Sequence, residues 1–217
     1  MSNWFKQADG LDDATVESYM DDNSISDTEE MVLKSGSPTM AYSFARDIVA
    51  LGKDVSAEIE ALIIKDAISA YNYAREVLQE RWYGAEDIIS KDLQIASMYA
   101  AELMNSRWEE VEYEIAQNPD IAFPYMQDLV EGPWPEAEEG FSKDPFYAYA
   151  YAQGQLFARW PKGEEAIARS AEWSFSYARN VINGRFLEGE DSIAESPNYS
   201  ELYKQEVYPD FNREDYL

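Results

Sequence analysis

Five glutamates recur at an interval of 26 residues, and carboxylates are the side chains of this sequence that could do acid–base or metal chemistry. They are Glu86, Glu112, Glu138, Glu164 and Glu190. Two carboxylates can hydrolyse a glycosidic bond when they converge on it within roughly 5 to 10 Å. Equivalent residues of stacked helical repeats lie ~10 Å apart. Stacking therefore places copies of one residue type in a row and does not bring different catalytic groups together. The spacing therefore favours a structural role in the first turn of a helix, where the helix dipole favours a negative charge.

A column of arginines supports this structural role. An arginine precedes four of the five glutamates by five residues, namely Arg81, Arg107, Arg159 and Arg185. Pro133 takes this place in the remaining repeat. Because a guanidinium can hold a carboxylate through two parallel hydrogen bonds, we predict arginine–glutamate pairs within the repeats.

The composition excludes most other catalytic chemistry. The 217 residues include no histidine and no cysteine, which excludes imidazole bases, thiolate nucleophiles, disulfides and His–Cys zinc sites. The acidic run 21–27 lacks the glycine and the closing glutamate of an EF-hand loop. We therefore predict no catalytic residue, no metal and no cofactor, so that the protein is not an enzyme.

The net charge restricts the partners. Against 17 Lys and Arg stand 43 Asp and Glu, which gives a formal net charge of −26. Direct binding to nucleic acid or to an anionic membrane is therefore not expected, and a partner attracted by charge should be basic. The sequence has no run of 18 apolar residues, and its first 22 residues lack the pattern of a signal peptide. These features predict a cytoplasmic protein without a membrane span.

A 26-residue repeat organises the chain. Six tyrosines return in register: Tyr73, Tyr99, Tyr125, Tyr151, Tyr177 and Tyr203. Nine residues after the first five come Trp82, Trp108, Trp134, Trp160 and Phe186. These aromatic columns could stack nucleic-acid bases, but alanines surround them at helical spacing, which favours burial in a core. An earlier repeat is centred on Phe44, with three extra residues expected in the loop 52–56.

Each repeat is predicted to contain two helices, of roughly 13 and 9 residues, the second of which begins after the Trp column. Prolines mark helix starts at Pro38, Pro119, Pro145 and Pro197, and at Pro135 and Pro161 in second helices. Such short helices cannot bury their apolar faces alone, so neighbouring repeats must stack. The predicted fold is all-α, an α-solenoid of stacked two-helix repeats.

Three regions are expected along the chain. Residues 1–37 form an acidic, degenerate N-terminal repeat that caps the stack, with helical segments over 14–20 and 28–34. Residues 38–208 form the solenoid, and residues 209–217 a partial C-terminal cap. The repeat with Pro124 and Pro133 is expected to have a shortened or kinked first helix.

Two phrases resemble a known family. Residues 159–164 read RWPKGE and residues 133–138 read PWPEAE, and the pattern Ala-Tyr-x-Tyr-Ala precedes the first of them. These phrases resemble the AYxYAxxVIxGRWPEAExxI repeats of tailed-bacteriophage proteins, over roughly residues 38–208. The resemblance implies a helical array, a viral origin and a non-enzymatic role. A viral origin in turn implies that the protein acts in the cytoplasm of the host cell.

The remaining acids form an expected acidic strip along the second helices. Its members, our candidate partner-binding residues, are Asp87, Glu110, Glu136, Glu139, Glu165, Glu188 and Asp191. Such a strip can simply be a solvated face that keeps a protein soluble. However, the net charge spread along ~60 Å of stacked repeats is about one charge per 2.3 Å, against about one per 1.7 Å for duplex DNA.

Two functional hypotheses follow. In the first, an acidic phage-type protein binds and inhibits a host defence protein by occupying its basic nucleic-acid-binding surface with carboxylates in place of phosphates. In the second, the repeats are a scaffold or adaptor for protein–protein assembly, held by apolar contacts. Phe146, Trp173 and Tyr199, near the starts of first helices, are the candidate anchors.

Overall fold

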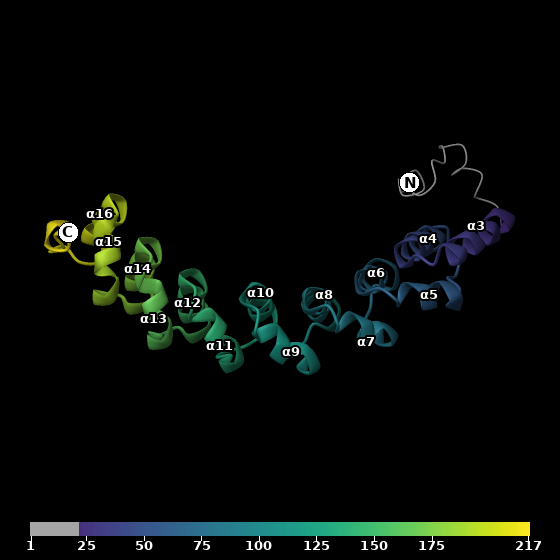
Figure 1. Ribbon diagram of the computed structural model, residues 1–217, viewed down its shortest axis with the longest axis horizontal. Helices are drawn as coiled ribbons and strands as arrows, with labels where there is room; N and C mark the ends of the chain where they lie inside the picture. The colour runs from purple at the N-terminus through teal and green to yellow at the C-terminus, as the bar shows by residue number, and fades with distance from the viewer. Residues whose placement is uncertain (1–21) are drawn as a thin grey trace. The chain divides into compact units, whose positions relative to one another are not determined.

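The computed structural model describes residues 22–217, and over this range every regular element is helical (Figure 1). The predicted all-α class is confirmed. The chain divides between Val111 and Glu112 into two compact units, here called unit 1 (the described residues up to Val111) and unit 2 (Glu112–Leu217). The predicted segment 14–20 lies outside the described residues.

Unit 1 begins with α3 (Asp22–Ser35), which packs against the first two-helix repeat. The helices of its repeats are α4 (Pro38–Ala50), α5 (Ala57–Ile63), α6 (Ala67–Tyr73), α7 (Glu86–Ile89) and α8 (Leu93–Tyr99). Helix α9 (Glu109–Ala116) contains the division between the units.

Unit 2 repeats the same alternation. Its first helices are α10 (Pro119–Leu129), α12 (Pro145–Tyr151), α14 (Ala171–Tyr177) and α16 (Pro197–Glu206), and its second helices are α11 (Pro135–Phe141), α13 (Pro161–Ala168) and α15 (Glu190–Glu195). Helix α14 packs against both α12 and α16, so neighbouring repeats stack through their first helices (Figure 1).

Side-chain caps start the first helices. The six predicted proline starts are all confirmed as first-turn residues. The residue seven positions before the central tyrosine caps the helix with its side chain at Asp66, Asp92, Asn118, Asp144 and Ser170. This further column with a 26-residue interval is visible in the sequence.

The ends of the first helices correct the sequence prediction. A continuous α-helix of about 13 residues was expected, but four first helices change to a π-helical turn immediately after the central tyrosine. These turns are 74–78, 100–104, 152–156 and 178–182. Each turn is followed by a residue with left-handed backbone, for example Asn183 with φ 53°. The N–H of Asn183 donates to the carbonyl oxygen of Ala178, the first residue of the turn. The next N–H bonds to the same carbonyl, so one oxygen terminates the helix.

Helix α10, for which a shortened or kinked helix was predicted, differs from these four. It is α-helical throughout and ends at Leu129, one residue before the position where the π-helical turns end. The left-handed residue that follows is Gly132. Second helices are also shorter than the nine residues expected, with four to eight residues.

The predicted core columns are buried, except that Trp82 of the Trp column is half-buried. The central tyrosines from Tyr73 to Tyr203 are at most 1% exposed, and Ile89, Ile115, Phe141, Ile167 and Ile193 are fully buried. The alanines three residues before and one residue after these tyrosines, such as Ala70 and Ala74, are buried as well. The apolar residues four positions after a central tyrosine are only half-buried, since they lie in the last turn of each first helix: Val77, Leu103, Leu129 and Val181.

The two ends of the repeat array are covered. In α3, Thr28 and Val32 are buried. At the other end, α16 stops at Glu206 and the tail folds back, so that the buried Phe211 lies against Tyr203 with ring centroids 5.1 Å apart. Arg213 donates to the carbonyl of Ala194 at 2.5 Å. The three extra residues of the first repeat lie in the link between α4 and α5, as predicted.

Close packing between helices gives a first testable prediction. A Cβ added at Gly189 would lie 2.4 Å from the hydroxyl of Ser174 and 2.6 Å from the ring of Phe186. We expect Gly189→Ala to lower the free energy of unfolding by about 1–3 kcal/mol, because a packed site must expand. Gly154→Ala is the control, since the space there is open, and it should stabilise by about 0.5–1 kcal/mol. Urea denaturation measures both, and a neutral Gly189→Ala would contradict this packing.

Candidate interaction surfaces

The glutamate column is bound by arginine, as predicted, in three repeats. Each arginine holds both carboxylate oxygens of the glutamate five residues later: Arg81–Glu86 at 2.5 and 2.9 Å, Arg159–Glu164 at 2.9 and 2.9 Å, and Arg185–Glu190 at 2.9 and 2.7 Å. The two-oxygen geometry fixes the carboxylate at the start of the second helix. These carboxylates are therefore structural in position and engaged by their own repeat.

The central tyrosines reach across to the preceding repeat, which the sequence analysis did not foresee. Their hydroxyls donate to the glutamate thirteen residues earlier: Tyr73 to Glu60 at 2.8 Å, Tyr99 to Glu86 at 3.4 Å, Tyr151 to Glu138 at 3.2 Å, Tyr177 to Glu164 at 2.9 Å and Tyr203 to Glu190 at 2.9 Å. We call each such glutamate, its tyrosine and its arginine, where present, a node. Every node ties a first helix to the second helix before it.

The same hydroxyls also accept a backbone hydrogen bond. The donor is the N–H of the Trp-column residue seventeen positions earlier: Trp82 to Tyr99 at 2.6 Å, Trp134 to Tyr151 at 2.8 Å, Trp160 to Tyr177 at 2.7 Å and Phe186 to Tyr203 at 3.0 Å. A buried backbone N–H without a hydrogen-bond partner is costly. The tyrosine hydroxyl therefore satisfies a backbone N–H that the turn itself leaves without an acceptor.

Two departures from the pattern are informative. Glu60 belongs to the glutamate column, 26 residues before Glu86, but the first repeat lacks the tryptophan and arginine that made the others visible. In the repeat where Pro133 replaces arginine, the ammonium of Lys162 from the next second helix lies 3.7 Å from Glu138. A cation from a neighbouring repeat thus partly replaces the missing guanidinium.

Burial shifts the titration of the nodes. Burial raises the pKa of Tyr99 and of Tyr151 to about 12, and the neighbouring carboxylate adds to this, against the lowering effect of the backbone N–H. Burial alone would raise the pKa of Glu190, but hydrogen bonds from Arg185, Tyr216 and Tyr203 lower it overall. The pKa of Glu164 is lowered in the same way. The nodes of Glu164 and Glu190 therefore favour a neutral phenol beside an ionised carboxylate.

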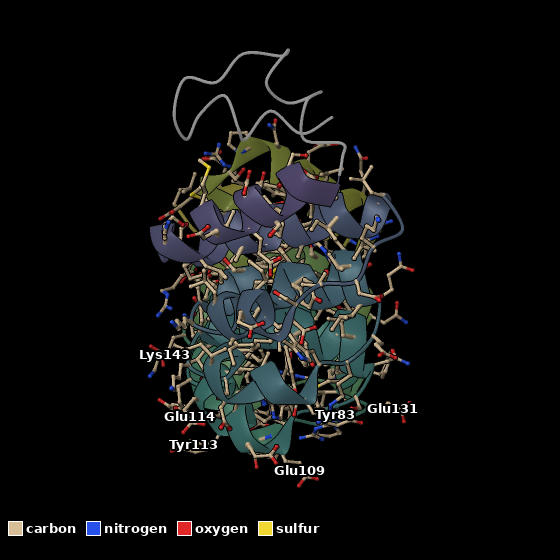
Figure 2. All side chains as sticks on the ribbon, turned by 90° about the vertical axis from the view of Figure 1, so that its right-hand side faces the viewer. Tyr83, Glu109, Tyr113, Glu114, Glu131 and Lys143 are labelled. Carbon is tan, nitrogen blue, oxygen red and sulfur yellow. The ribbon has the colours of Figure 1, made fainter. Side chains whose placement is uncertain are left out.

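The predicted acidic strip lies on the surface. All seven of its residues are exposed: Asp87, Glu110, Glu136, Glu139, Glu165, Glu188 and Asp191. Neighbouring side chains of α9, Glu109, Tyr113 and Glu114, also extend outward (Figure 2). The second helices of both units thus present carboxylates to solvent.

Two residues of this strip are partly neutralised. Glu139 pairs with Lys143 at 2.9 Å and lies 3.8 Å from Lys162, and Glu165 is 3.9 Å from Arg169. The other five, Asp87, Glu110, Glu136, Glu188 and Asp191, have no ion pair among the described residues. The strip is thus less negative at two positions than its sequence indicated, because Lys143 and Arg169 follow these acids by four residues and Lys162 lies on the next second helix.

An aromatic patch in unit 2 brings together two of the three predicted apolar anchors. Phe146, which is 39% exposed, lies 5.3 Å from Trp173 and 5.2 Å from Phe123, measured between ring centroids. Tyr149 stacks on Trp173 at 5.2 Å. The third anchor, Tyr199, lies instead against Phe175 at 6.0 Å. The patch, which also includes Tyr147, spans α10, α12 and α14.

Comparison with known proteins does not indicate a function for this chain. No family model, curated protein or solved structure matches the chain. The resemblance to bacteriophage repeats therefore rests on the sequence motifs alone. Within residues 22–217 there is no helix long and apolar enough to cross a membrane, and no cluster of acidic side chains arranged to hold a metal ion.

Proposed function

We propose that this protein is a non-catalytic interaction protein whose acidic strip binds a basic surface of a partner protein. The observation that carries the proposal is that five strip carboxylates are exposed and form no ion pair within residues 22–217, while Arg81, Arg159 and Arg185 are engaged in the nodes. A surface that keeps its carboxylates free of internal cations retains its attraction for a basic partner.

The more specific form of this proposal names the partner class. The carboxylates replace the phosphates of a nucleic acid on a host defence protein, and a bacteriophage encodes the chain. The charge density along the repeats and the RWPKGE-type motif support it. Displacement by duplex DNA distinguishes this form from binding to any other basic protein.

Two variants that have the same net charge as each other test the acidic strip. The strip variant carries Asp87→Asn, Glu110→Gln, Glu136→Gln, Glu188→Gln and Asp191→Asn. The control variant removes five exposed carboxylates elsewhere, by Asp54→Asn, Glu80→Gln, Glu195→Gln, Asp210→Asn and Glu214→Gln. Both lose five negative charges, so only the position of the charge differs.

We expect the strip variant to bind a captured partner about a hundredfold more weakly than the control variant, since five surface ion pairs contribute about 2–3 kcal/mol together. The immobilised proteins are loaded with bacterial lysate and eluted in a salt gradient, with and without duplex DNA. Equal retention by both variants would contradict the proposal. A partner indifferent to salt and DNA would instead support the scaffold hypothesis.

A further inference from the structure

Arginines lie over buried aromatic rings of several first helices. Three of these rings lie two residues before the repeat centre and carry the arginine four residues later: Tyr42 and Arg46 at 5.7 Å, Tyr71 and Arg75 at 5.0 Å, and Phe175 and Arg179 at 5.9 Å. The distance is from the guanidinium carbon to the ring centroid. A cation over an aromatic face is attracted by the negative charge of the π-system.

The aromatic patch lacks these internal cations. The rings at the equivalent positions are Phe123 and Tyr149, and the residues four positions later are the neutral Gln127 and Gln153. Both glutamines are exposed. In the described part of the chain, no arginine or lysine covers a ring of the patch.

Carboxylates border this patch. Asp120 accepts a hydrogen bond from the Tyr147 hydroxyl at 2.6 Å, and that carboxylate raises the pKa of Tyr147 to about 12. Glu172, which precedes Trp173, is exposed. Neither acid has an ion pair within the described residues. Aromatic faces beside unpaired carboxylates match a guanidinium, which stacks on rings and binds carboxylates at once.

We propose that the aromatic patch, together with Asp120 and Glu172, binds an arginine side chain presented by a segment of a partner protein. The partner's guanidinium lies over the exposed ring of Phe146, beside Trp173. This surface belongs to first helices, whereas the acidic strip belongs to second helices, so the inference stands independently of the proposed function.

Binding of a labelled peptide of alternating glycine and arginine tests this inference. Fluorescence anisotropy at about 0.15 M salt limits long-range attraction by the net charge. Phe146→Leu removes the most exposed ring, and Gln153→Arg adds the internal cation seen at Arg75 and Arg179. Each should weaken binding about tenfold. The same peptide with citrulline, a neutral isostere of arginine, should bind at least tenfold more weakly.

Gln94→Arg is the matched control, because it adds the same charge at an exposed position of unit 1. Its affinity should change less than about twofold, as expected for a surface charge that is not part of the patch. Gln153→Arg removes no packed side chain, so it remains informative even if Phe146→Leu unfolds the repeat. Unchanged binding in Gln153→Arg, or equal binding of the citrulline peptide, would overturn the inference. Loss of binding only in the strip variant would assign the peptide to the acidic strip.

Discussion

Glu190→Ala should lower the free energy of unfolding by about 3–4 kcal/mol. The Glu190 side chain is 1% exposed and accepts hydrogen bonds from Arg185, from Tyr203 at 2.9 Å and from Tyr216 at 2.5 Å. Without the carboxylate, the buried Tyr203 hydroxyl loses its acceptor and the guanidinium loses its counter-charge. Chemical denaturation followed by circular dichroism measures the change.

Glu138→Ala is the matched control for this prediction. It removes the same atoms from the same position of another repeat, but Glu138 is 23% exposed, has Pro133 in place of arginine, and meets Lys162 only at 3.7 Å. We expect a loss of about 1 kcal/mol, because water can replace part of what is removed. Similar losses in the two variants would show that the arginine-containing nodes contribute nothing beyond the tyrosine hydrogen bond.

Raising the pH above 10 should unfold the protein cooperatively. The pKa values of Tyr99 and Tyr151 are raised to about 12, and those of Tyr73, Tyr177 and Tyr203 are raised too, chiefly by burial. A raised pKa means that the stability is complete below the unfolded value of 10.0 and is lost as the pH rises towards the folded value. Only the unfolded chain ionises these phenols readily in that window.

The expected size of this effect is large. At about pH 11, each buried phenol favours the unfolded state by about 1.4 kcal/mol, so five together contribute about 7 kcal/mol, which is comparable to the total stability of a domain. Tyrosinate absorbance and far-ultraviolet circular dichroism, recorded on the same samples, should change together. Ionisation of every tyrosine near pH 10 while the helices persist would contradict the prediction.

Two exposed tyrosines provide the control for the alkaline transition. Tyr83 and Tyr113 are 71% and 65% exposed, so their hydroxyls should contribute little to stability. The double variant Tyr83→Phe, Tyr113→Phe should therefore retain the pH midpoint of helix loss.

Most of the buried columns, but not the half-buried residues at the ends of the first helices, could be predicted from the sequence. Periodicity at 26 residues located the repeats, proline and the helical spacing of apolar residues located the helix starts and the core columns, and the five-residue interval predicted the arginine–glutamate pairs. Each of these features lies within one repeat. It could be predicted because helical backbone geometry fixes which residues a few positions apart lie on the same face.

Tertiary structure decided what each repeat meets in its neighbour. The hydroxyl of Tyr203 donates to Glu190, and the ammonium of Lys162 lies near Glu138. Phe146 contacts Trp173, whereas Tyr199 contacts Phe175 instead. The π-helical turns, which end these first helices where a continuous α-helix was expected, also lay beyond the sequence pattern. A column of identical residues specifies a face but not the rotation between stacked repeats, and this rotation, set by side-chain packing, selects the contacts.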